Sequence, residues 1–459
     1  MRQEYHFRVA AAVLHPTAET RVWRSAGSLF LSLRRQTCNR YTSFPMPTLR
    51  RPRWPRSARQ AKGHAILVAV ILWIVAGIVS FIGTSDRGIA GPLKGADFVH
   101  FYTLGHLASS HRVAPMYDAA LLHRAQVELI PESAPEIYPP VYPPQAAVLF
   151  APMSGLSYQR ALLIWNLITI AGYMLIVWSV WRAVAHRLAD RTFFVAAAAA
   201  FPPFWSLILH GQITIILLVA FWAGWLALER HRHWLAGFAF GLLAIKPQFG
   251  IPLAIVVLTC GEWAMLAGAM TSVMAQAAVV WLMLGSEAFT AFAERIPTTI
   301  AYADFLEPKP FMSHSLRALT RLTPSWIGLP LWAALAAIVL GYTVRAWKSQ
   351  APIRVRLGVV VLAATLVNPH VIIYDLTVLA LPLIWFGSYM QEPPRRENAG
   401  PYWTTVYWLF VSTFMPTAAV IGLQASVFVM VGLLVLVARA IQADAITHAP
   451  ATIDNRIAA

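Results

Sequence analysis

The chain is short of charged residues. Only 12% of its 459 residues are Asp, Glu, Lys or Arg, whereas an ordinary soluble domain has about 25%. Hydrophobic residues make up 58% of the chain, which also contains 18 tryptophans. This composition excludes an ordinary soluble enzyme and an intrinsically disordered chain, and it predicts an integral membrane protein.

Cysteine and acidic residues are also scarce. Cys38 and Cys260, the two cysteines, offer neither a disulfide framework nor a CxxC metal site. The 20 acidic residues face 36 Lys and Arg, for a net charge of +16. Most of this excess lies in residues 1–62, where 12 arginines and Lys62 stand against two glutamates, a net +11. The charge is therefore local, and we expect no nucleic-acid partner.

We treat residues 1–63 as a basic N-terminal arm. The arm mixes Arg with Pro and lacks the apolar region and cleavage site of a signal peptide, so we expect it to be retained in the cytoplasm. Two interpretations stay open. The arm is an unstructured extension, with Met46 as an alternative start, or it lies on anionic lipid.

Apolar stretches follow the arm and predict an all-α polytopic membrane protein with about 10–12 transmembrane helices. Several stretches are shorter than the roughly 20 residues that a perpendicular helix needs, so some are expected to be half-spans. The stretches lie at about 65–83, 159–181, 192–209, 213–228, 234–246, 248–260, 264–284, 326–344, 355–367, 371–387, 402–421 and 424–441.

Strict alternation of these spans places every short basic loop on the same side as the arm, as the positive-inside rule requires. Both termini are then cytoplasmic, with residues 64–441 as the multi-span domain and 442–459 as a tail. Two long polar segments, 84–145 and 285–325, fall outside. In the first we expect membrane-surface helices, over an amphipathic run from Phe98 and over Tyr117 to Leu129, and a re-entrant turn at about 146–153.

Asp97 stands out among the acids because it combines a position near the outer surface with a dense aromatic and histidine setting, GADFVHFYTLGH. A partly desolvated carboxylate there suits a general base. An Asp before an amphipathic run also suits a helix N-cap. The residues alone leave both interpretations open.

Four polar groups interrupt apolar runs at one level, the outer ends of the predicted spans: HGQ (210–212), KPQ (246–248), SHS (313–315) and NPH (368–370). Such breaks on one face predict a lipid-facing active site, although Lys246 alone would suit snorkelling to the interface. Arg321 alone would suit a solvated helix face. The candidates for binding substrate or a donor phosphate are Lys246, His314, His210, Gln212, Arg317, Asn368 and His370.

The ordered set of motifs resembles glycosyltransferase family 87, over about residues 64–440. The set runs DFxxFY (97–102), YPPxxxxL with a following Pro (142–152), Trp165-Asn166, GQ (211–212), GxxxxxKPQ (241–248), SHSL (313–316) and NPHxxxYD (368–375). The resemblance implies the C-type membrane glycosyltransferase fold and a polyprenyl-phosphomannose donor bound from the outer leaflet. It also implies that Asp97 is the general base and that the donor site lies near Lys246. Relatives often have an Asn-Gln-Ser-like string where this chain has Ser313-His314-Ser315.

We therefore expect a cell-envelope enzyme that moves a hexose, mannose first, to an acceptor at the outer (periplasmic or extracellular) face. The acceptor is a glycolipid, a glycan or a protein. Another lipid-linked sugar, arabinose or glucose, is the alternative within this class, and a secondary transporter is the alternative outside it. We expect no cofactor and no metal, because the outer segments contain no DxD-type pair and no i, i+4 histidine pair.

Overall fold

A computed structural model describes residues 58–83, 86–88, 91–185, 191–301, 310–393, 395, 399–413, 418 and 422–447. The arm up to residue 57, including Met46, and the tail from residue 448 lie outside the described residues. The described residues are helical, with two isolated β-bridges, Gly83 to Gly88 and Arg87 to Leu93. The predicted all-α polytopic membrane protein is thereby confirmed.

Six helical segments in the described part are long and apolar enough to cross a membrane. They are α3 (Ala58–Phe81), α8 (Tyr158–Val180) with the π-helical turn η3 (Trp181–Ala185), α14 (Trp263–Leu284), α18 (Ser325–Trp347), η6 (Ile373–Leu379) continued by α20 (Ala380–Gln391), and α23 (Ala425–Thr447). Two further helices, α9 (Arg191–Ala199) and α10 (Pro202–His210), form a pair bent by 47° that makes a seventh span if counted as one.

The predicted count of 10–12 spans is therefore higher than the six or seven that the described helices support. Other apolar stretches form shorter helices within the described residues. They are α11 (Thr214–Leu228), α12 (His233–Phe240) with η4 (Gly241–Ile245), α13 (Pro247–Thr259), α19 (Ile353–Val367) and α21 (Ala399–Ser412). Lys246 of the KPQ group separates η4 from α13, so these two stretches form separate short helices, in line with the expected half-spans.

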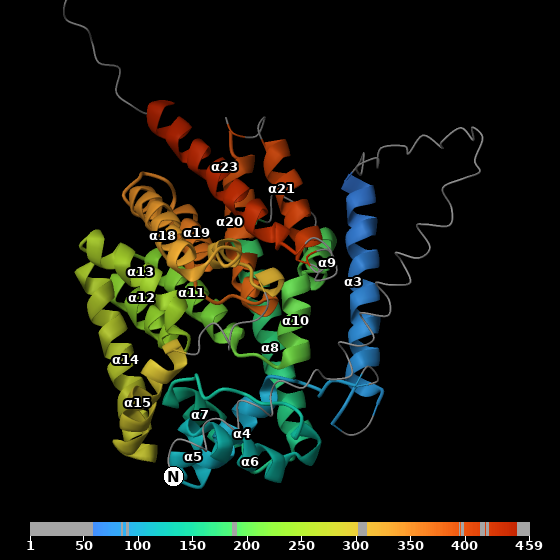
Figure 1. The fold of residues 1–459 in the computed structure, drawn as a ribbon. Helices are drawn as coiled ribbons and strands as arrows, with labels where there is room; N and C mark the ends of the chain where they lie inside the picture. Colours follow the sequence, from blue (N-terminus) through green and yellow to red (C-terminus); the bar gives the residue numbers. More distant parts are fainter. Residues whose placement is uncertain are drawn as a thin grey trace, which may run out of the picture. The chain divides into compact units, whose positions relative to one another are not determined.

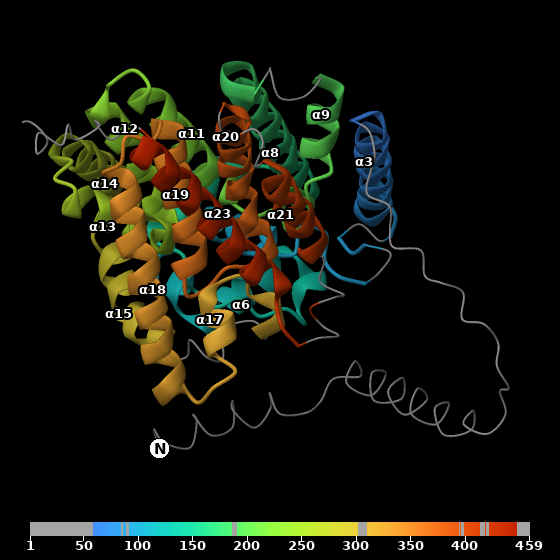
Figure 2. The same ribbon diagram turned by 90° about the horizontal axis from the view of Figure 1, so that it is seen from above.

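The helices divide into a lipid-facing shell and a buried centre. Only 11% of the span Ser325–Trp347 is buried, against 89% of Ile373–Gln391. Exposed apolar side chains such as Leu282 on α14 and Ile338 on α18 suit contact with acyl chains. In Figure 2, α3 lies at one edge beside α9, and α14 lies on the opposite side.

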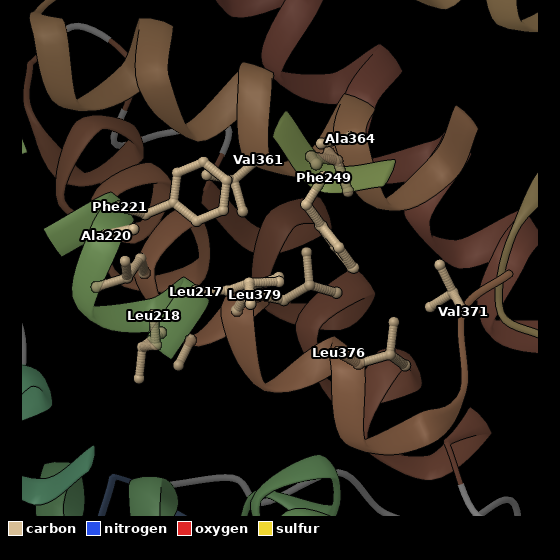
Figure 3. Packing of buried hydrophobic residues seen from close by; sticks show 14 of the residues in the cluster. Leu217, Leu218, Ala220, Phe221, Phe249, Val361, Ala364, Val371, Leu376 and Leu379 are labelled. Carbon is tan, nitrogen blue, oxygen red and sulfur yellow. The ribbon is translucent and has the colours of Figure 1, made fainter. Parts of the chain in front are cut away.

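The centre is built by α11, α13, α19 and η6. Figure 3 shows Leu217 and Phe221 of α11, Phe249 of α13, Val361 of α19 and Leu376 of η6 among the buried side chains that pack there. These residues are fully buried. A close-packed centre of this kind holds the ends of its helices in fixed positions, and those ends carry the polar breaks.

The two long polar segments fold at one end of the described part. The first forms α4 (Phe98–Ser109), α5 (Ala114–Tyr117), α6 (Ala119–Leu129), η1 (Pro131–Ser133), α7 (Pro144–Phe150) and η2 (Ala151–Met153); the second includes α15 (Glu287–Ala301), η5 (Pro310–Met312) and α17 (Leu316–Thr320). In Figure 1, α4–α7 and α15 lie at the lower end, while α20, α21 and α23 lie toward the upper end. Tyr117 and Phe292 join the two segments, with ring centroids 5.6 Å apart.

Helix α4, the run that begins at Phe98, is buried within the protein on nearly all sides, including its polar residues His100 and Thr103. The helix packs against α7, η2, α6 and α8. Other protein segments therefore cover this helix, and its placement at the membrane surface stays a prediction. Asp97 directly precedes the buried helix.

Candidate active site

The four polar breaks meet, as the sequence predicted. The HGQ group forms the turn between α10 and α11, which Gly211 allows by adopting a left-handed backbone with φ 63°. The backbone N–H of Asp97 donates to the carbonyl of His210 over 3.0 Å. The backbone N–H of His314 donates to the carbonyl of Val371 over 2.8 Å, which ties the SHS group to the NPH group.

Asp97 does not cap helix α4. It occupies the N-cap position, but its side chain makes no capping hydrogen bond, so the N-cap interpretation is wrong. Gln212 Nε2 instead donates to Asp97 Oδ2 over 2.8 Å, and the Tyr374 side chain interacts with the same carboxylate. No ion pair involves Asp97 within the described ranges. The carboxylate is only partly buried, so an incoming hydroxyl group can approach it.

The YPPVYPP segment covers Asp97 with two neutral tyrosines. The hydroxyl of Tyr142 is 3.3 Å from the amide of Gln212, and the hydroxyl of Tyr138 donates to the carbonyl of Ala96. Burial raises the pKa of Tyr142. Burial, and then the charges of Asp97 and Glu136, raise the pKa of Tyr138. Both hydroxyls therefore stay protonated and can donate hydrogen bonds beside the carboxylate.

Lys246 forms an ion pair with Asp375, to which the sequence analysis gave no role. Its Nζ lies 2.7 Å from Asp375 Oδ1 and 3.3 Å from Thr214 Oγ1. The Thr214 hydroxyl also donates to Asp375 Oδ1 over 2.7 Å. Lys246 is 4% exposed and Asp375 is 1% exposed, so the snorkelling interpretation of Lys246 is wrong. The buried pair is charge-compensated, as an ionic group at this depth must be.

His314 is neutral and hydrogen-bonded through both ring nitrogens. Nδ1 lies 2.7 Å from Ser426 Oγ, and Nε2 lies 3.3 Å from Gln424 Nε2. The amide of Gln424 donates to Nε2, so the proton of the ring sits on Nδ1 and is donated to Ser426. Burial lowers the pKa of His314 from 6.5 to about 3. His314 therefore contributes hydrogen bonding and shape at neutral pH, and no positive charge.

Of the remaining candidates, His370 lies among several charged residues. His370 is partly exposed and lies within electrostatic range of Asp375, Lys246, Arg321 and Asp97; burial, its largest influence, lowers its pKa. Arg321 is partly exposed, and its solvated-helix-face interpretation stays open.

His210, Asn368 and Arg317 are held by local contacts. His210 Nδ1 is 2.8 Å from the carbonyl of Ser206. Asn368 Oδ1 accepts a hydrogen bond from the backbone N–H of His370 over 2.9 Å. Arg317 is buried, and its Nη1 lies 3.5 Å from Thr320 Oγ1. All three side chains are therefore oriented by their own segments.

Sequence reasoning missed the residues that complete these contacts. Asp375 was visible as the last residue of NPHxxxYD, and Thr214 follows HGQ by two positions. Gln424 and Ser426 had no motif to mark them. Among the described residues no group of three or more His, Cys, Asp or Glu side chains could hold a metal ion.

Comparison with known proteins adds the class of enzyme. The structure combines helices long enough to span a membrane with a half-buried carboxylate that accepts a hydrogen bond from Gln212. The family model of glycosyltransferase family 87 matches residues 141–369. The chain belongs to this family and is a membrane glycosyltransferase. The matched range begins after Asp97, includes the HGQ, KPQ and SHS groups, and ends within the NPH group. No curated protein and no solved structure matches the chain.

Proposed function

We propose that this glycosyltransferase moves a hexose, with mannose as the first candidate, from a polyprenyl-phosphate sugar to an acceptor hydroxyl at the outer face of the cytoplasmic membrane. The proposal rests on the surroundings of the Asp97 carboxylate. It accepts a hydrogen bond from Gln212, caps no helix, and stands where the HGQ turn meets the folded polar segments. A carboxylate so placed suits general-base catalysis.

The proposed step is a single displacement. Asp97 accepts the proton of the acceptor hydroxyl, and the oxygen forms a bond to the anomeric carbon as the bond from that carbon to the phosphate oxygen breaks. The lipid phosphate leaves with the electron pair, and the anomeric configuration inverts. Asp97 has no competing ion pair within the described ranges, so its charge is available to the proton.

The departing phosphate needs positive charge or hydrogen-bond donors. His370 is one candidate, because the charges of Asp375, Lys246, Arg321 and Asp97 all act on its ring; Arg321 is another. Lys246 remains a proposed phosphate ligand, but its charge is already matched by Asp375 in the structure. Two roles for Lys246 therefore need separate tests.

The test uses the purified protein in nanodiscs with a panel of polyprenyl-phosphate sugars, mannose, glucose and arabinose among them. We expect transfer or slow release of one sugar, measured by loss of the lipid-linked donor. Arabinose or glucose as the preferred sugar would correct the substrate while keeping the reaction. Activity with a nucleotide sugar, and none with any lipid-linked donor, would refute the proposed donor class. Family membership already speaks against the transporter alternative.

A further inference from the structure

A second polar group lies around His314, on segments other than the one that carries Asp97. We call it the His314 cluster, and it consists of Ser313, His314, Ser315, Asn368, Gln424 and Ser426. Hydrogen bonds join its segments: His314 bonds to Ser426 and Gln424, and the amide of Gln424 also donates to the carbonyl of Phe311 over 2.8 Å. The backbone bond from His314 to Val371 brings in the NPH segment.

The cluster contains buried polar atoms that have no protein partner. They are Ser313 Oγ, Ser315 Oγ, Asn368 Nδ2 and Gln424 Oε1. The four residues are at most 3% exposed. A buried polar atom without a partner is costly, and native proteins retain few of them without a reason. Four such atoms lie on three segments that hydrogen bonds join, which is the pattern expected of polar atoms kept for a ligand.

The types of atom indicate the chemistry of that ligand. The amide of Asn368 offers donors, the carbonyl of Gln424 offers an acceptor, and the two serine hydroxyls offer both. His314 is neutral, so the cluster brings no charge of its own at that ring. A phosphate is acceptor-rich and would face the carbonyl oxygen of Gln424 without a hydrogen bond. Sugar hydroxyls both donate and accept, and they match the mixed set.

We propose that the His314 cluster binds hydroxyl groups of the sugar ring that is transferred. This inference rests on the proposed function. Asn368 holds the backbone of His370, and His370 lies within electrostatic range of Asp97 and Arg321. A sugar attached to a phosphate near His370 would therefore present its hydroxyls to the cluster. The sequence left His314 and Asn368 as candidates for binding either substrate or a donor phosphate, and the cluster favours the sugar for both.

The test compares the double variant Ser313→Ala/Ser315→Ala with the wild type, in nanodiscs. The donors are the polyprenyl-phosphate hexose that the wild type transfers and its monodeoxy analogues. We expect the wild type to prefer the parent donor over at least one analogue by about 10- to 100-fold in kcat/KM, because a site built for a hydroxyl rejects a donor that lacks it. In the double variant this preference should fall toward onefold, with the acceptor KM unchanged.

Two controls separate binding from folding. Removing unpartnered hydroxyls breaks no protein hydrogen bond, so the Tm of the double variant should not fall; the single Ser313→Ala variant serves if the double variant is unstable. Thr365→Val removes a buried hydroxyl on α19 that does have a partner, the carbonyl of Val361 at 3.0 Å, and it should keep the wild-type preference.

An unchanged donor preference in the serine variants would overturn the inference alone, and so would a change confined to the acceptor KM. A wild type that transfers from no polyprenyl-phosphate sugar would overturn the proposed function, and this inference with it.

Discussion

The carboxylates of Asp97 and Asp375 differ in their bonding partners, although both accept a hydrogen bond from the turn between α10 and α11. Within the segment from Gly211 to Thr214, the amide of Gln212 donates to Asp97, and the hydroxyl of Thr214 donates to Asp375. Asp375 also receives the charge of Lys246. Asp97 instead accepts a hydrogen bond from the neutral amide of Gln212. Since no cation neutralises its charge within the described residues, Asp97 can accept a proton more readily than Asp375 can. This difference supports Asp97 as the proposed base and suggests a positioning role for Asp375.

The first prediction concerns Asp97. Asp97→Asn keeps the size of the side chain but cannot accept a proton, so turnover at saturating donor should fall by about 10²–10⁴-fold. Asp118→Asn is the matched control, because Asp118 caps α6 through Leu121 N at 2.8 Å, and Asn caps about as well. Near-normal turnover in Asp97→Asn would show that the base lies elsewhere.

The second prediction separates the two roles of Lys246. Lys246→Met leaves Asp375 as an unpaired buried charge, which costs about 3–5 kcal/mol of stability. Lys246→Met/Asp375→Asn removes both charges and should recover most of the lost Tm. If Lys246 also binds the donor phosphate, the double variant is folded but has a raised donor KM. A normal donor KM in the double variant would show that Lys246 does not bind the donor phosphate and that its role is the ion pair with Asp375.

At the scale of elements, the turn between α10 and α11 places Gln212 and Thr214. Gly211 there has φ +63°, and a Cβ at this position would lie 2.6 Å from Cβ of Phe98. Gly285, at the end of α14, has φ +73° with open space around it. Both glycines have a positive φ, but Gly285 has ψ −175°, in a region nearly confined to glycine, whereas Gly211 is left-handed helical with ψ 35°. Only Gly211 lies close to the helix that follows Asp97.

The third prediction uses this difference. Gly285→Ala should cost about 1–3 kcal/mol of stability, because its backbone conformation is nearly confined to glycine, and should leave turnover unchanged. Gly211→Ala should also be destabilising, because it must push Phe98 away, and it alone should lower kcat by moving Gln212 relative to Asp97. Thermal unfolding and single-turnover rates of both variants test the comparison. Equal losses of kcat in the two variants would contradict a special role for the HGQ turn.

Much of the helical pattern could be predicted from hydropathy, since each of the twelve apolar stretches contains a helix. The meeting of the four polar breaks was also predictable, because they lie at the same ends of alternating spans. The partner of Lys246 was not, because hydropathy does not say which helices are neighbours. The burial of helix α4 was not predictable for a similar reason: its sequence does not show which helices pack around it.

At the scale of the whole molecule, the sidedness is still a prediction from the basic loops. Figure 1 places α4–α7 at the end of the described part opposite to the C-terminal end of α23. This arrangement is the one that alternation requires if 84–145 lies outside and the tail lies inside. A donor can enter the site from the outer leaflet only if the chain has this sidedness.

The fourth prediction tests this sidedness with two exposed polar residues. In a background with Cys38 and Cys260 replaced by alanine, Ser110→Cys should react with an impermeant thiol reagent in intact cells. Gln350→Cys, in the basic loop between α18 and α19, should react only after permeabilisation. Both side chains are exposed, so accessibility within the fold does not decide the result. Labelling of Gln350→Cys in intact cells would reverse the topology.

The ion pair between Lys246 and Asp375 also bears on how the chain assembles in the membrane. The two residues are 129 positions apart, and they belong to segments that enter the bilayer separately. An unpaired charge of either sign is costly within the apolar part of a membrane. The segments that carry them gain their partner only once α11, α13 and η6 have packed together. Until the Lys246–Asp375 pair has formed, assembly intermediates should stay bound to the translocon or to chaperones. A chain truncated between α13 and η6 should be degraded, because Lys246 then lacks its partner.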